Sequence, residues 1–489
     1  MLALLAQGFR NKKKGVPPQI SKESVTKPFQ EIGGKLPMST YFRQESLFDL
    51  QELYDLEPTQ RFASVFSSVS IAPLLGVVEK KTSFGRPVKC NYSAMIYSLL
   101  ARIMERIPTV KDLIKRLETD LRFKRDCGFL ISECVPSEAS YSRMITKISE
   151  SGALETMNQD IVATAMNVGA IKNGHVAIDA THVEARDQAP KKKTEKPKQQ
   201  PKKRGRKPKS EREQWLKEKQ VQKEALPLYK KKIEAQLDIP YDVLHDQMPL
   251  EPQWGVEKNS ENKQESWFGY KVHLAVDTKS QFILHSMVSS GNLNDGKAAI
   301  PLLKGITHLF PGFSLDYTMM DAGYDFEPIY QHVHAMNAYS LIAYNKRNES
   351  EPVGFNQHFA PTCVREHAYR YDSFDKKYQT LKYTRPKECI DCPLAQDTLC
   401  QKVFKIKIET DLRRYSSPAR GSKAWENLYK ERTSVERVNG YLKEHFQLNN
   451  VRHRTGQKAK IHVDMVTLVY NSMKLASFRL KKNQVQSVA

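Results

Sequence analysis

Three acidic residues stand where carboxylates could share a metal ion. Asp179 follows the apolar run 176–178 in "HVAIDATHVEAR", where a carboxylate is costly unless it is paired or binds a cation. Asp321 ends an apolar segment directly before the turn "AGYD", and Glu436 lies between cations in a predicted helix. Hard oxygen ligands of this kind suit Mg²⁺. Two such ions would activate an attacking oxygen and stabilise the leaving oxygen of a phosphodiester.

The stretch "YKERTSVERVNGYLK" (429–443) gathers polar groups on one helical stripe. At 100° per residue, Tyr429, Arg432, Glu436 and Lys443 fall within about 60° of one another. Arg432 and Lys443 could hold DNA phosphates while Glu436 holds the metal. Tyr429 could stack on a base or a sugar, or could pack the helix onto the sheet. Taken singly, a Glu beside an Arg on a helix is usually a surface ion pair.

Two further aspartates compete with Asp321 for the second metal position. Asp295 lies in "NLND", and Asp325 ends "DAGYD". The strand-end position favours Asp321. We interpret Asp295 as a structural or substrate-side residue, and the alternative role of Asp325 is to cap the helix that follows.

The elements that position these residues change character near residue 172. Apolar residues at three- and four-residue spacing predict helices over 93–107, 110–123 and 137–171, with Ser137 able to cap the last. From 175 onward the pattern predicts strands over 175–186, 266–277, 282–290, 316–325 and 338–346, with helices at 297–310 and near 328–336. Such an alternation predicts an α/β sheet.

The predicted organisation has seven parts. They are a flexible basic N-terminus (1–40), a helical module (41–172), a sheet core in two pieces (173–186 and 264–346), a Lys-rich insertion (187–263), a Cys-containing insertion (347–425), a segment with the catalytic and C-terminal helices (426–480), and a tail (481–489). The helical module could dock on DNA, or it could serve packing or oligomerisation.

The charge balance indicates a polyanionic partner. The 489 residues carry a formal charge of +22, which points most simply to nucleic acid. A membrane span is not expected, because the longest apolar run, 63–78, is interrupted and shorter than the roughly 20 residues required. The opening "MLALLAQGF" has its basic residues after it, the reverse of a secretory signal, so we expect a cytoplasmic protein.

Two basic segments are candidates for DNA contact. Residues 187–232 hold 18 Lys or Arg against 6 Asp or Glu, and Arg204 and Arg206 flank a glycine there. Such an arm can lie in a narrow minor groove, or it can be a solvated linker. The second segment contributes the candidate phosphate contacts Arg452, Arg454, Lys458 and Lys460, with a solvated loop as the alternative.

Four of the seven cysteines have spacing that could bind zinc. Cys389, Cys392 and Cys400 form a C-x2-C-x7-C pattern, and Cys363 could be a fourth ligand, with His358 or His367 as substitutes. A set of metal-free buried cysteines is the alternative, because no second C-x2-C confirms a zinc knuckle.

Several motifs resemble those of bacterial insertion-sequence transposases of the DDE class. The catalytic ones are "AIDATHVEA", "DAGYD" and Tyr-x2-Arg-x3-Glu-x6-Lys. The similarity extends through "GRPVKCNYSAMIYSLLARIMERIPTVKDLIKRL", "GYKVHLAVD", "GNLNDG", "NNVRHRTGQKAK" and the final helix, and thus covers most of the chain. The long basic insertion after the first Asp occurs only in some members.

The resemblance implies an RNase H-like α/β catalytic domain with insertions, preceded by an all-helical domain. It implies that Asp179, Asp321 and Glu436 bind two Mg²⁺ ions, with Mn²⁺ as a substitute, and that Arg432 and Lys443 contact the transposon end. The expected partners are double-stranded DNA, both transposon ends and target, and further copies of the chain in a dimer or larger synaptic complex near the nucleoid. A nuclease that cuts without joining, and a non-catalytic DNA-binding descendant, are the alternative functions.

Overall fold

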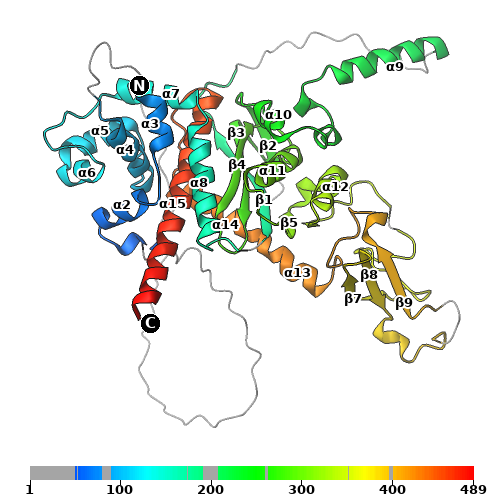
Figure 1. Ribbon diagram of the computed structural model, residues 1–489. Coiled ribbons are helices and arrows are strands. Elements are labelled where there is room, and N and C mark those ends of the chain that lie inside the picture. Colours follow the sequence, from blue (N-terminus) through cyan, green and yellow to red (C-terminus); the bar gives the residue numbers. More distant parts are fainter. Residues whose placement is uncertain are drawn as a thin grey trace, which may run out of the picture. The chain divides into compact units, whose positions relative to one another are not determined.

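A mixed six-stranded sheet carries Asp179 and Asp321 (Figure 1). The computed structural model describes residues 50–51, 53–79, 90–172, 174–190, 208–258, 263–350, 352–395 and 400–488, and everything below concerns these. The strands are β1 (His175–Glu184), β2 (Gln253–Lys258), β3 (Gln264–Asp277), β4 (Ile283–Ser290), β5 (Tyr317–Met320) and β6 (Tyr339–Ile342).

The strand order is β2-β3-β1-β5-β6, and β4 also pairs with β3. β1 runs antiparallel to β3 and parallel to β5, which in turn runs parallel to β6. The turn predicted at 278–281 joins β3 to β4. β2, which the sequence pattern did not predict, pairs with the first part of β3, while β4 pairs with the rest.

Two helices cover opposite faces of this sheet. Ile178, Ala275 and His285 are cross-strand partners, so they point to one face, where His285 lies against Gly305 of α11 (Gly296–Leu309). Asp179 is the next residue along β1 and therefore points to the other face. There Asn439 of α14 (Thr433–His445) contacts it. The alternation along β1 thus directs Asp179 toward α14.

The region before residue 172 is helical, as predicted, but its helices are shorter. They are α2 (Pro58–Phe66), α3 (Ala72–Val78), α4 (Tyr92–Met104), α5 (Val110–Thr119), α6 (Leu121–Asp126), α7 (Glu138–Ser149) and α8 (Ala153–Asn167). The helix predicted over 110–123 breaks because Asp120 accepts from the backbone N–H of Phe123 and so starts α6. The helix predicted over 137–171 divides at Gly152. Ser137 is the N-cap residue of α7, but its side chain makes no capping hydrogen bond.

The last helix joins the helical region to the sheet. α15 (Gly456–Val488) contacts α2, α4, α7 and α8 as well as β4, and Figure 1 shows it running beside α8. Its residues from Ile461 to Ala476 are almost all buried. No described helix is long and apolar enough to cross a membrane.

Two insertions have structure of their own. The first contains α9 (Lys209–Glu224), η1 (Leu228–Lys230), η2 (Ile233–Gln236) and α10 (Tyr241–Asp246) before β2. The second contains the antiparallel sheet β7 (Arg370–Asp375), β8 (Thr380–Thr384) and β9 (Val403–Lys407), with the short turns η4 (Lys387–Cys389) and η5 (Ile408–Thr410). A separate apolar cluster, which includes Tyr369, Leu381 and Tyr383, supports this sheet.

The polar stripe at 429–443 is not one continuous helix. α13 (Lys423–Tyr429) is followed by the 3₁₀ turn η6 (Lys430–Arg432) and then by α14. Similarly, the strand predicted over 316–325 ends at Met320. The 3₁₀ turn η3 (Ala322–Tyr324) and α12 (Glu327–Ala335) follow it.

Candidate functional site

The three predicted acidic residues lie near one another, with Asp179 in the middle of β1 and Asp321 directly after β5. Ala177 of β1 is level with Met319 of β5, so the same register places Asp179 level with Asp321. Glu436 lies in the first turn of α14, one helical turn before the Asn439 that contacts Asp179. The sheet and the helix therefore bring Asp179, Asp321 and Glu436 to one site.

The carboxylates at this site repel one another. Burial, together with the negative charges of Asp321 and Glu436, raises the pKa of Asp179 to about 7. Burial also raises the pKa of Asp321, and Asp295 and Glu436 act in the same direction. Keeping these buried carboxylates ionised is therefore unfavourable in free energy, and a bound cation would offset this unfavourable term.

Each carboxylate has a protein partner in this conformation. Asn439 Nδ2 donates to Asp179 Oδ2 at 3.0 Å, and the backbone N–H of Gly323 donates to Asp321 Oδ1 at 2.9 Å. Glu436 pairs with Arg432 at 2.8 Å, and its side chain is 47% exposed. Among the described residues no group of three His, Cys, Asp or Glu side chains is arranged to hold a metal ion. In this conformation Glu436 is paired with a protein cation, Arg432.

The two predicted phosphate-binding cations flank the carboxylates. Arg432 lies 5.6 Å from the ring centroid of Tyr429 and is close enough to lower the pKa of both aspartates. Burial lowers the pKa of Lys443, while the charges of Glu257 and Asp179 raise it. Both cations therefore lie within electrostatic range of Asp179.

Two family models match the chain. The model of the transposase DDE domain matches residues 240–472, which include Asp321 and the whole 429–443 signature. A second transposase domain, DUF772, matches residues 51–147 in the helical region, so that together the matches cover roughly two thirds of the chain. The chain belongs to the DDE transposases. Asp179 lies between the two matched spans, and among curated proteins no match is found.

Membership of this family carries two general properties. Transposases bind DNA, and DDE transposase domains use divalent metal ions. Oxygen ligands on two strands and a helix, with the mutual repulsion described above, fit such an ion.

Asp295 and Asp325 are both engaged in ion pairs in the transposase. Asp295, just before α11, pairs with Lys271 at 2.7 Å, and its charge raises the pKa of Asp321. Asp325 does not cap α12, whose N-cap residue is Phe326. It is fully buried and accepts from Arg413 Nη2 at 2.7 Å. The capping role considered for Asp325 is therefore wrong.

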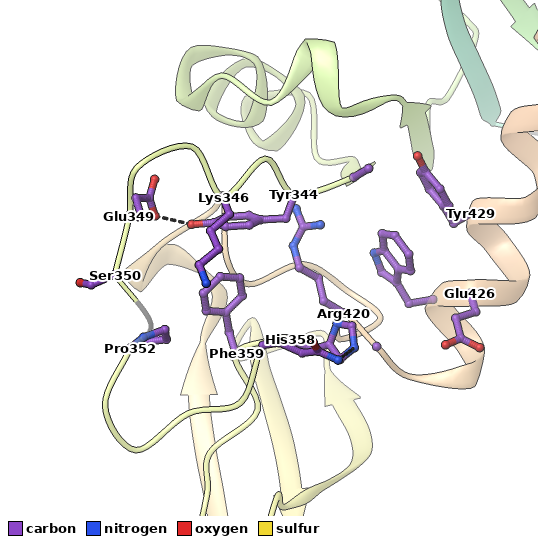
Figure 2. Close-up of a pocket in the computed structure, with 14 residues that line it drawn as sticks. Tyr344, Lys346, Glu349, Ser350, Pro352, His358, Phe359, Arg420, Glu426 and Tyr429 are labelled. Atoms are coloured by element: carbon purple, nitrogen blue, oxygen red, sulfur yellow. Dashed lines mark hydrogen bonds between the residues drawn. The ribbon is translucent and has the colours of Figure 1, made fainter. Parts of the chain in front are cut away.

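Tyr429 contacts Trp425, one helical turn earlier. The two rings stack with centroids 4.6 Å apart and planes 14° apart. They line a cavity of about 490 Å³, and Figure 2 shows it bounded on its other sides by Tyr344, Phe359 and Arg420. Packing of Tyr429 is thus observed, and its stacking on a base or sugar stays a prediction.

The cysteine prediction has a mixed outcome. Burial raises the pKa of Cys389, and the charges of Cys400, Cys363 and Cys392 act in the same direction, so the four thiols lie near one another. They do not form a set that could hold a metal ion in the described residues, so the structure does not support the zinc prediction. The backbone N–H of Leu394 and the side chain of Arg365, which donates to Cys392 Sγ at 4.0 Å, lower the pKa of Cys392.

The predicted basic contacts divide into three groups. Arg204 and Arg206 lie outside the described residues, whereas Arg452 and Arg454 are exposed before α15. Lys460 is not available to DNA. It pairs with Asp464 at 2.8 Å and with Glu155 of α8, and these ion pairs raise its pKa. Its predicted phosphate contact is wrong, because these two carboxylates compensate its charge.

Sequence analysis missed Asn439, which orients Asp179. Its position three residues after Glu436 was the only signal, since residues three apart share a helical face. Asn439 is 6% exposed, and its hydrogen bond helps to fix the orientation of the Asp179 carboxylate, to which the backbone N–H of Ala180 also donates.

Replacing Asn439 by Ala is expected to lower DNA cleavage about 10- to 100-fold, because it removes the support of a metal-binding carboxylate. As a positioning residue, Asn439 should act on metal binding, so the variant should need more Mg²⁺ for half-maximal cleavage. A Mg²⁺ titration of cleavage measures this. Asn450→Ala, which removes a surface hydrogen bond to Pro108, is the matched control. An unchanged Mg²⁺ requirement would contradict the assigned role.

Proposed function

We propose that this transposase binds the terminal inverted repeats of its own mobile element, cuts the DNA there and joins the freed end to target DNA. The observation that carries the proposal is the placement of Asp179 level with Asp321, with Glu436 on the helix facing them. The strand order supports an RNase H-like fold, because one antiparallel and one parallel ladder meet at β1.

In this mechanism Asp179, Asp321 and Glu436 hold two Mg²⁺ ions, for which Mn²⁺ could substitute. The ions supply activation of the attacking oxygen and stabilisation of the leaving oxygen. To bind a metal ion, Glu436 must break its ion pair with Arg432. Arg432 is then free to bind a phosphate of the DNA. Lys443, which lies within electrostatic range of Asp179, holds a neighbouring phosphate. The ion pair is thus the resting form of the site.

Two chemical steps follow. Water attacks the phosphorus at the element's end, a P–O bond forms, and the bond to the 3′ oxygen breaks to leave a 3′-hydroxyl. That 3′-hydroxyl attacks a target phosphodiester, forms a new P–O3′ bond and displaces the target's own 3′ oxygen. No covalent enzyme intermediate is required. Because two ends must be joined in one event, we propose that at least two copies of the chain act together.

A joining assay tests this function. Purified full-length protein is incubated with Mg²⁺, a target plasmid and linear DNA carrying the sequences that flank its own gene. Plasmid molecules with inserted ends are the expected product. Cleavage without any joined product would instead identify a nuclease, and binding without cleavage would identify a non-catalytic DNA-binding protein.

A further inference from the structure

A group of basic residues lies where the helical region meets the catalytic domain. Arg102 is in the last turn of α4, Arg186 follows β1, and Arg452, His453 and Lys458 surround the start of α15. We call Arg102, Arg186, Arg452 and His453 the Arg102 cluster. Arg186 Nη1 donates to the backbone oxygen of Arg452 at 2.6 Å, so the segment after β1 and the segment before α15 are in contact.

Arg102 is the unusual member of this cluster. Only 5% of it is exposed, its Nε is buried without a hydrogen-bond partner, and it forms no ion pair with any described residue. A buried arginine normally has a carboxylate or several carbonyl oxygens around it, because desolvating a cation without compensation is costly. The fold therefore buries a cation that it does not compensate.

The surroundings of Arg102 add to this cost. Burial and, to a smaller extent, the neighbouring charge of Arg452 together lower the pKa of Arg102 to about 10. The pKa of His453 is lowered to about 4 by burial and by the charges of Arg102, Lys458 and Arg186. The nearby Asp187 accepts from the backbone N–H of Thr455 at 3.2 Å. An external anion would compensate this cluster.

The position of the cluster indicates which anion it binds. From Asp179 to the end of β1 at Glu184 the strand rises roughly 16 Å, and Arg186 lies two residues beyond. Lys443 lies between, because its charge acts on both Asp179 and His182. Lys443 and Arg186 thus lie along β1 beyond Asp179, among the carboxylates of Glu184, Glu257 and Glu265, and we take these two cations as contacts to successive parts of a DNA strand.

We propose that Arg102, together with Arg452, binds a backbone phosphate of the DNA some distance from the bond that is cut. This inference rests on the proposed function, since it assumes that DNA occupies the site of Asp179. The bound phosphate contacts one arginine from the helical region and one from the catalytic domain. Both regions of the protein therefore bind the same DNA molecule at this point.

The test is DNA binding as a function of salt, measured by fluorescence anisotropy with a labelled duplex carrying the gene's flanking sequence. EDTA is present, so no cleavage occurs. Arg102→Met is expected to bind about tenfold more weakly and to reduce the slope of log affinity against log salt by roughly one. Arg452→Gln should weaken binding similarly. The affinity of the double variant for the duplex should fall by less than the product of the two single-variant factors, because both side chains bind the same phosphate.

Arg116→Met is the matched control, because Arg116 lies in the same helical region but already has a carboxylate partner, Asp120, at 3.1 Å. It should leave the slope unchanged. The unfolding temperature gives an independent readout: without DNA, Arg102→Met should unfold no lower than the wild type, whereas a purely structural arginine would lower this temperature on removal.

A wild-type salt slope in both Arg102→Met and Arg452→Gln would overturn the inference while leaving the proposed function intact. Arg452 is exposed, so its variant decides the question even if Arg102→Met fails to fold. A wild type that binds the duplex but never cuts it would instead overturn the proposed function and leave the phosphate site standing. A wild type that binds no DNA would overturn both.

Discussion

Asp179→Asn is expected to reduce DNA cleavage at least 10³-fold while leaving DNA affinity within a few-fold of the wild type. The change keeps the shape of the side chain but removes one negative metal ligand, and metal stabilisation of the transition state contributes several kcal/mol. Cleavage of an end-labelled duplex gives the rate, and anisotropy in EDTA gives the affinity. Asp246→Asn, at an exposed carboxylate of α10, is the matched control.

The same variant should be more stable than the wild type in EDTA. Asp179 is buried beside Asp321, and both burial and mutual repulsion disfavour its charged form. An amide avoids that cost, so the unfolding temperature should rise by a few degrees. Greater stability together with lost cleavage would show that a repulsive site is maintained for its chemistry. Lower stability together with retained cleavage would contradict the assigned role of Asp179.

Asp321→Asn and Asp295→Asn separate the two candidates for the second metal ligand. Asp321 lies level with Asp179, so its variant should match Asp179→Asn in severity. Asp295 already neutralises Lys271, and its loss should reduce cleavage much less. If Asp295→Asn were the more severe change, the second position would have to be reassigned to Asp295.

The sequence was informative where a carboxylate directly follows an apolar run, although Asp179 lies in the middle of its strand and only Asp321 follows a strand end. Asp179 and Asp321 could be placed because each follows an apolar run, and parallel strands bring such positions together. The Tyr-x2-Arg-x3-Glu-x6-Lys spacing identified Glu436 with its cations. The break at η6 was not predictable from that spacing, because helical periodicity continues through 3₁₀ residues almost unchanged.

What the sequence could not show depends on contacts between distant residues. β2 follows a long polar insertion and becomes a strand because the first part of β3 offers it an edge. Lys460 looked like one more cation in a basic loop. Only the fold reveals Glu155, 305 residues earlier, beside it. The sequence likewise could not show that Arg102 lacks an ion-pair partner among the described residues. Whether a carboxylate lies near Arg102 depends on which distant residues the fold brings close to it.

Arg413→Met is expected to destabilise the protein by about 3–5 kcal/mol, the effect of leaving a buried carboxylate without its cation. Asp325 is fully buried and accepts from Arg413 Nε at 3.0 Å and Nη2 at 2.7 Å. Tyr330 and the backbone N–H of Asn345 donate to it as well. Arg413 belongs to the Cys-containing insertion, so this ion pair joins the insertion to the sheet core. Thermal unfolding and limited proteolysis would measure the loss.

Arg414→Met is the matched control at the adjacent residue. Arg414 is partly exposed, its contacts with Glu349 and Asp411 are 3.5 and 3.3 Å long, and its removal should cost no more than about 1 kcal/mol. Adding Asp325→Asn to Arg413→Met should recover part of the stability, because the second change removes the uncompensated charge. Equal losses of stability in Arg413→Met and Arg414→Met would refute the role of the buried pair.

The buried pair should also affect activity, because Asp325 is only four residues after Asp321. Arg413→Met should therefore lower DNA cleavage, and the double variant should recover stability more fully than cleavage activity.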